Sequence, residues 1–207
     1  MPTAILLPMA VLAGYLLGAI PFGVVICRPL GKDPRLVGSG RTGGTNVYRT
    51  AGVLPAVLTV LGDGLKGAAA VWLAASLVPG SDQALAMALA ALAAILGHNY
   101  SVYVGFAGGA GSTPNIGAFL ALSPNPLWFV GAAVIGGLVW KFGRMASVAS
   151  LTLSVVLLAS TAWLVYSGQR PPTLLVYGVG QLALVAWALR PNIKRLLEGR
   201  EIRVDSR

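Results

Sequence analysis

Residues 38–49, which read GSGRTGGTNVYR, form a polar, basic and glycine-rich segment in a chain that is otherwise very apolar. Its four glycines let the backbone turn sharply and direct N–H groups toward one ligand. Its two arginines add permanent charge in a planar form that suits bidentate contact with phosphate. The segment therefore predicts an anion site, with a basic connecting loop as the alternative. The candidate binding residues are Ser39, Gly40, Arg41, Thr45, Asn46 and Arg49.

A second glycine-rich stretch, residues 106–117, supports this interpretation. Its Ser112-Thr113-Pro114 sequence predicts the start of a helix, because proline suits the first helical turn and Ser112 or Thr113 can cap it. Free N–H groups at such a start attract anions. One glycine-rich loop is weak evidence, but two with basic residues nearby indicate an anionic substrate. The candidate binding residues here are Gly108, Gly109, Gly111 and Ser112.

Ionisable residues also occur within or at the end of apolar segments. Asp63 and Lys66 are three residues apart and would share one face of a helix, and such residues inside a membrane span are functional candidates. His98 could act as a general base or bind a phosphate or hydroxyl group. The alternatives are an Asp63–Lys66 pair that only anchors its helix, and a histidine bonded to a backbone carbonyl. The candidate catalytic residues are His98, Asn99 and Lys66.

Polar residues at two other places have plain structural interpretations. Ser147 and Ser150 open an apolar segment, where serine usually caps a helix. Residues 190–197 are basic and amphipathic and follow the last apolar segment, which predicts a surface helix on anionic lipid headgroups.

The elements that must position these residues are membrane helices. Of the 207 residues, 56% are hydrophobic and 10% are charged, whereas a soluble domain has roughly 25% charged residues. The long apolar runs predict an all-α, polytopic membrane bundle. One cysteine, Cys27, excludes an internal disulfide, and no P-loop, His/Cys metal cluster or Gly-x-Ser-x-Gly turn occurs. We expect one domain, residues 1–207, with a basic cytoplasmic tail at 190–207.

The bundle is expected to have about seven transmembrane helices. With the N-terminus outside and the C-terminus cytoplasmic, thirteen of the fifteen lysines and arginines lie on the inner side. Both glycine-rich stretches then share that side. The expected spans are Ala4–Cys27 with a kink at Pro21, Val53–Val78, Gln83–Tyr103, a short Asn115–Leu122, Leu127–Trp140, Met145–Tyr166 and Leu174–Leu189.

The order and spacing of these motifs resemble the bacterial membrane glycerol-3-phosphate acyltransferases that use acyl phosphate as donor, the PlsY family. The resemblance covers the chain from Tyr15 to Glu201. The matching segments are Gly18–Gly23, Val37–Gly40 with Gly43, Thr45–Val47, Leu65–Gly67 with Asp63, Leu96–Tyr100, Phe106 with Gly108, Gly109 and Gly111, Arg144 with Ser147 and Ser150, and Arg190 with Asn192–Leu197 and Gly199.

The resemblance implies seven spans, a site at the cytoplasmic face, and acyl transfer from acyl phosphate to the 1-hydroxyl of glycerol 3-phosphate. The products would be lysophosphatidic acid and phosphate. It implies that Ser39 and Arg49 hold a substrate phosphate, that Ser147 and Asn192 line the glycerol phosphate site, and that residues 108–111 cradle the acyl phosphate. It also implies a multi-pass protein of the bacterial inner membrane. Its partners would be these substrates and the bilayer, with no metal, cofactor or nucleic acid. The oligomeric state stays open, with a monomer as one option.

The chain differs from the family pattern at several positions. The family typically has lysines where this chain has Ala107 and Ala110, asparagine at Arg41, alanine at Gly44 and often histidine at Leu189. We expect Arg41 to replace the missing lysine charge from the facing loop. The alternatives are a homologue with a changed donor or acceptor, or one that binds or transports a phosphate-bearing ligand without acyl transfer. A transporter is expected to show internal repeats, and the sequence shows no convincing one, which favours the enzyme.

Overall fold

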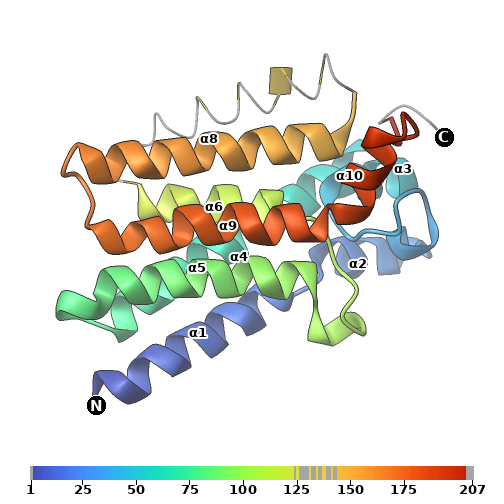
Figure 1. Cartoon of the computed structure of the whole chain (residues 1–207). Coiled ribbons are helices and arrows are strands. Elements are labelled where there is room, and N and C mark those ends of the chain that lie inside the picture. The colour runs from blue at the N-terminus through green and yellow to red at the C-terminus, as the bar shows by residue number, and fades with distance from the viewer. Residues whose placement is uncertain are drawn as a thin grey trace.

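The structure is a computed structural model in which residues 2–123 and 144–203 are described, together with the single positions 125, 131, 134, 137, 138 and 141. Every regular element in this part of the chain is a helix. The long helices lie side by side, and the short helices α2, α3 and α10 gather at one end of the bundle with the C-terminus (Figure 1). The N-terminus lies at the opposite end.

Most predicted spans correspond to helices of the structure. Four helical stretches of the described part are long and apolar enough to cross a membrane, or five if one bent pair counts as a span. The predicted span Leu127–Trp140 lies largely outside the described residues. The helices are α1 (Thr3–Ala19), α2 (Phe22–Cys27), α3 (Gly44–Ala51), α4 (Val53–Leu77), α5 (Gln83–Asn99), α6 (Ser112–Leu122), α8 (Ala146–Tyr166), α9 (Leu175–Ala188) and α10 (Arg190–Leu197).

Interruptions in the helices lie at the end of the bundle that holds the short helices. The predicted kink is confirmed, because α1 ends at Ala19 and α2 starts after Pro21, which lacks an N–H and restricts the residue before it. A second break separates α9 from α10. The helix axis bends by 64° between residues Pro172–Ala188, which include α9, and α10. Helix α6 has 11 residues, so it is about 16 Å long and too short to cross a membrane alone.

The predictions of serine or threonine caps are wrong at both helix starts. Gly111 precedes α6 with a left-handed φ of 87°, so Ser112 is already inside the helix and no side chain caps it. Met145 precedes α8, again without a side-chain cap. The hydroxyl groups of Ser112 and Ser147 are therefore not used for capping.

Glycines let neighbouring helices approach very closely. A methyl group on Gly18 of α1 would overlap the backbone of Ala94 in α5, and one on Gly117 of α6 would overlap the backbone of Gly64 in α4. Membrane helices associate through such small residues because lipid supplies no hydrophobic drive between them. The two contacts fix α1 to α5 and α6 to α4, and both pairs lead to the polar end of the bundle.

A buried polar network joins α6 to two further helices. The Tyr177 hydroxyl donates to Asn115 Oδ1 at 2.6 Å, and Asn115 Nδ2 donates to Gln181 Oε1 at 2.6 Å. Gln181 Nε2 in turn donates to the carbonyl oxygen of Ser154 at 2.8 Å. The network ties α6 to α9 and α8, and Tyr177, Asn115 and Gln181 are fully buried. Because an unpaired polar group is costly there, the network specifies the orientation of these helices.

We expect Gly18→Ala to destabilise the protein by about 1–3 kcal/mol, because the added methyl group must separate α1 from α5. The measurement is the thermal unfolding midpoint in detergent. Gly64→Ala is the matched control, since its methyl group would meet only Thr113 Cγ2 at 4.0 Å, and alanine favours a helix by ~1 kcal/mol over glycine. A Gly18→Ala protein as stable as the native one would contradict the close-contact explanation.

Candidate functional site

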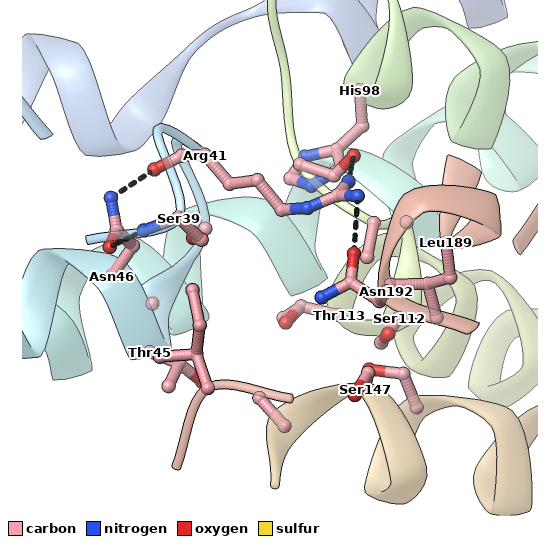
Figure 2. Close-up of a pocket in the computed structure, with 18 of the residues that line it drawn as sticks. Ser39, Arg41, Thr45, Asn46, His98, Ser112, Thr113, Ser147, Leu189 and Asn192 are labelled. Carbon is pink, nitrogen blue, oxygen red and sulfur yellow. Dashed lines mark hydrogen bonds between the residues drawn. The ribbon is translucent and has the colours of Figure 1, made fainter. Parts of the chain in front are cut away.

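A polar pocket of about 140 Å³ lies at the end of the bundle where the short helices gather. Residues from both glycine-rich stretches, from the ends of α5 and α9, from the starts of α3, α6 and α8, and from α10 and the tail line it. Figure 2 shows the Arg41 side chain extended across this pocket toward Asn192, with His98 beside its tip. Segments far apart in the sequence thus meet at one place, as the sequence predicts for the two glycine-rich stretches.

Direct hydrogen bonds join the two glycine-rich stretches. The N–H group of Thr42 donates to the carbonyl oxygen of Gly108 at 3.4 Å. Asn46 holds the first stretch in shape, because its Nδ2 donates to the carbonyl oxygens of Val37 at 2.9 Å and Arg41 at 2.8 Å. Its Oδ1 accepts from the N–H group of Ser39 at 3.2 Å. Asn46 is 2% exposed, so this side chain acts within the loop although it borders the pocket.

Arg41 links four segments of the chain. Its Nη1 donates to the carbonyl oxygen of Gly109 at 3.0 Å. Its Nη2 donates to the carbonyl oxygen of Ala188 at 2.6 Å and to Asn192 Oδ1 at 2.9 Å. Burial, and to a smaller extent the charge of Arg195, lower the pKa of Arg41. The guanidinium group is still a fixed cation, so it places positive charge in the pocket wall beside the second glycine-rich stretch.

Of the three helices that begin at the pocket, α3 and α6 start within the two glycine-rich stretches. Gly44 and Thr45 start α3, and Ser112 and Thr113 start α6; all four line the pocket. The N–H groups of a first turn have no helical partner and carry partial positive charge, which favours anions. The buried Ser112 hydroxyl has no hydrogen-bond partner within the described part of the chain. Such a group at the edge of a pocket is available to a ligand.

The C-terminal tail closes one side of the pocket through Glu201. Its Oε1 accepts from Ser147 Oγ and Asn192 Nδ2, both at 2.7 Å, and its Oε2 accepts from Arg195 Nε at 3.1 Å. Burial raises the pKa of Glu201, but the hydrogen bonds from Asn192 and Ser147 and the charge of Arg195 outweigh it, so the pKa is lowered overall. The carboxylate therefore stays ionised and ties α8 to α10.

A buried ionic cluster lies behind the pocket. Lys66 Nζ is 2.6 Å from Asp63 Oδ1 and donates to the carbonyl oxygen of Ile20 at 2.7 Å, so it anchors α4 at the break between α1 and α2. His98 Nδ1 is 3.4 Å from the same Asp63 oxygen. The His98 ring lies where a side chain on Gly109 would have to go. Only His98 of this cluster lines the pocket.

The structure brings most of the predicted site residues together. Four of the fifteen do not line the pocket. They are Lys66 in the ionic cluster, Asn99 with its Nδ2 3.4 Å from the carbonyl oxygen of Leu184, Gly40 in the first glycine-rich loop, and Gly108 against the end of α5. The residues that line the pocket are His98, Ser39, Arg41, Thr45, Asn46, Arg49, Gly109, Gly111, Ser112, Ser147 and Asn192.

Sequence reasoning missed Glu201 as a pocket residue. Its carboxylate contacts two of the predicted binding residues, yet in the sequence it is one acid in a basic tail. The available signal was that the family resemblance extends to this position. Thr113, Leu189 and Ile202 also line the pocket and were not predicted as binding residues. Leu189 and Ile202 are aliphatic, and the sequence predicted a capping role for Thr113.

Comparisons with known proteins agree with this geometry. A sequence profile described as glycerol-3-phosphate acyltransferase matches residues 8–199. The glycerol-3-phosphate acyltransferases of Syntrophotalea carbinolica and Halalkalibacterium halodurans are 43% and 38% identical to the chain. Each alignment covers 93% of this chain. It covers 94% of the Syntrophotalea protein and 93% of the Halalkalibacterium protein.

Solved structures give the same result. The crystal structure of PlsY, an integral membrane glycerol 3-phosphate acyltransferase, in its glycerol 3-phosphate form superposes with a TM-score of 0.82 at 33% identity. The superposition covers 95% of this chain and 94% of that one. The lysophosphatidic acid form gives a TM-score of 0.81. The chain is therefore an integral, multi-pass membrane protein, and it belongs to the PlsY family of glycerol-3-phosphate acyltransferases.

Proposed function

We propose that this protein transfers a fatty acyl group from acyl phosphate to the 1-hydroxyl of glycerol 3-phosphate. The new bond is an ester between the acyl carbon and the glycerol oxygen, and the bond that breaks is the acyl–phosphate anhydride. The hydroxyl proton leaves with the released phosphate, so the products are lysophosphatidic acid and inorganic phosphate. No protein base is needed if a substrate phosphate accepts that proton.

The observation that carries the proposal is the convergence of anion-binding features on one pocket. Two glycine-rich loops, two helix starts, Arg41 and Arg49 all face it. Both substrates bear a phosphate, and developing charge on an acyl-transfer transition state is best stabilised by such preorganised groups. Holding two phosphate-bearing molecules side by side also removes much of the entropic barrier. The family membership makes acyl transfer the chemistry that fits these features.

The roles follow from each residue's place in the pocket. Ser39 and Arg49 would hold one phosphate, and the loop 109–111 with the Ser112 hydroxyl would hold the other. Ser147 and Asn192, which Glu201 positions, would face the glycerol.

Behind these contacts lie the residues of the ionic cluster and its neighbours. His98 would shape the site from the floor beside Gly109. Lys66 and Asn99 lie behind the pocket wall, so we propose that they act on the reaction by holding His98 and the α5 end in place.

We further propose seven spans with the N-terminus outside and the pocket at the cytoplasmic face, in one domain with a cytoplasmic basic tail. The end of the bundle that holds the pocket carries the basic loop 28–49 and helix α10 (Figure 1). The opposite end carries Arg170, in the connection between α8 and α9. Cytoplasmic loops are rich in lysine and arginine, which supports this orientation.

The proposed reaction is tested with purified protein, palmitoyl phosphate and glycerol 3-phosphate, by measuring lysophosphatidate by mass spectrometry. We expect lysophosphatidate and phosphate in equal amounts, and neither product in a reaction that lacks glycerol 3-phosphate. Phosphate release without glycerol 3-phosphate would indicate hydrolysis or another acceptor. Folded protein that forms no product would contradict the proposal and favour a binding or transport protein.

We expect Arg41→Ala to lower the rate of acyl transfer by about 10²–10³-fold, because it removes both the charge and the link between the two loops. Arg41→Lys should retain part of the rate, since it keeps the charge but loses the forked geometry. If Arg41 replaces a lysine of the facing loop, Ala110→Lys should recover activity in the Arg41→Ala protein. Arg35→Ala, at an exposed arginine paired with Asp33, is the control. Full activity of the Arg41→Ala protein would disprove the idea that Arg41 replaces the family's loop lysine.

The lowered pKa of Glu201 predicts a pH-dependent contribution to stability. A carboxyl group whose pKa is lower in the folded state stabilises the fold at pH values above its unfolded-state pKa of ~4.3. This contribution disappears as the pH falls through the folded-state pKa. We expect Glu201→Gln to unfold at a lower temperature than the native protein at pH 7, and this difference to shrink below about pH 4. A difference that stays constant from pH 7 to pH 3.5 would show that the charge of Glu201 does not matter.

A further inference from the structure

The C-terminal tail turns back across the pocket directly after α10. Gly199 adopts a left-handed φ of 68°. The N–H groups of Gly199 and Arg200 donate to carbonyl oxygens in the last turn of α10, at 3.1 and 2.8 Å. This pair of bonds around a left-handed glycine ends a helix and redirects the chain. As a result, the next two residues, Glu201 and Ile202, line the pocket.

Residues 201–203 form a strap that is fixed at both ends. At one end the Glu201 carboxylate is bound to α8 and α10, and its side chain is 3% exposed. At the other end the carbonyl oxygen of Arg203 accepts from Arg49 Nη2 of α3 at 2.8 Å. The strap therefore crosses the end of the bundle where α3 and α10 lie together (Figure 1), between helices that all line the pocket.

The two ends of the strap differ in strength. The Glu201 end is a buried carboxylate with charge-assisted hydrogen bonds, which are the stronger kind. The Arg203 end is an exposed hydrogen bond, for which water competes. The strap can therefore lift at Arg203 to admit substrates while Glu201 keeps its place. A guanidinium group has several N–H donors, so Arg49 can bind a phosphate and still fasten the strap.

The middle of the strap is an apolar residue at a polar pocket. Ile202 lines the pocket, and so does Leu189, which follows α9 and is 2% exposed. Neither side chain can form a hydrogen bond with a phosphate, a hydroxyl group or water. Apolar side chains at the border of a reaction site exclude water from it.

Exclusion of water matters because water can also attack an acyl phosphate. Its oxygen would bond to the acyl carbon, the acyl–phosphate anhydride would break, and the products would be a fatty acid and phosphate. The groups that stabilise charge during attack by glycerol would stabilise this attack as well. The pocket, at about 140 Å³, has room for several water molecules of ~30 Å³ each. Selectivity for glycerol therefore requires a closed pocket rather than another polar group.

We propose that the strap, through Ile202, keeps water from the acyl phosphate and so determines that the acyl group passes to glycerol 3-phosphate. The inference rests on the proposed acyl transfer and identifies a residue that decides between two acceptors. In this account Glu201 is the fixed end of the strap, Arg203 is the end that opens, and Ile202 is the seal between them.

The seal is tested by a pair of variants of nearly equal size, Ile202→Thr and Ile202→Val, of which only the first adds a hydroxyl that binds water. Free palmitate and lysophosphatidate are measured by mass spectrometry in reactions with palmitoyl phosphate and glycerol 3-phosphate. We expect Ile202→Thr to raise the ratio of palmitate to lysophosphatidate about tenfold, and Ile202→Val to raise it far less. In water labelled with a heavy oxygen isotope, the label should enter the palmitate.

Two further variants separate sealing from general loosening of the tail. Ile202→Ala removes most of the side chain and should raise the ratio at least as much as Ile202→Thr. Ile193→Thr makes the same change at a half-buried isoleucine of α10 outside the pocket lining, and should keep the native ratio. The thermal unfolding midpoint of each variant in detergent shows whether it is folded.

The strap and the proposed reaction fail in different ways. Native protein that forms lysophosphatidate, with the same product ratio in Ile202→Thr and Ile202→Ala, overturns the strap and leaves acyl transfer intact. An equal rise in Ile202→Thr and Ile193→Thr, or in Ile202→Thr and Ile202→Val, also overturns the seal. Folded native protein that forms palmitate instead of lysophosphatidate overturns both proposals.

Discussion

The structure of the polar end depends on one half-buried cation, the Arg41 guanidinium. It reaches from the first glycine-rich loop to Gly109 of the second loop, to the end of α9 at Ala188, and to Asn192 of α10. A charge in this position is costly unless it is well hydrogen-bonded, and the three acceptors come from segments that are 68 to 151 residues away in sequence. Arg41 therefore fixes the mutual positions of the segments that make the pocket.

The rest of the bundle makes this arrangement possible. Glycine contacts allow α1 to lie against α5 and α4 against α6, and α4, α5 and α6 each contribute residues to the pocket. The Asp63–Lys66 pair fixes α4 at the break after α1 and places Asp63 beside His98. On the other side, Glu201 joins the start of α8 to α10. The polar end is thus rigid because each wall is tied by charge or by close backbone contact, which is what preorganised stabilisation of charge requires.

Much of the fold could be predicted from the sequence, because apolar runs and proline breaks report on local structure. The kink at Pro21, the shortness of α6 and the meeting of the two glycine-rich stretches were predicted correctly. The capping roles were not, since a left-handed Gly111 moved Ser112 into the helix. Neither the acceptors of Arg41 nor the role of Glu201 could be predicted from local pattern, because both depend on contacts between distant segments.

The most direct test of the central claim is the position of glycerol 3-phosphate in an experimental structure of this protein with that substrate bound. The account predicts that its phosphorus atom lies in the pocket between the two glycine-rich loops, with Arg49 or Ser39 in direct hydrogen-bond contact and the hydroxyl groups facing Ser147 and Asn192. It also predicts that Arg41 keeps its bond to Gly109. Substrate bound outside this pocket, or loops that separate as Arg41 releases Gly109, would contradict the account.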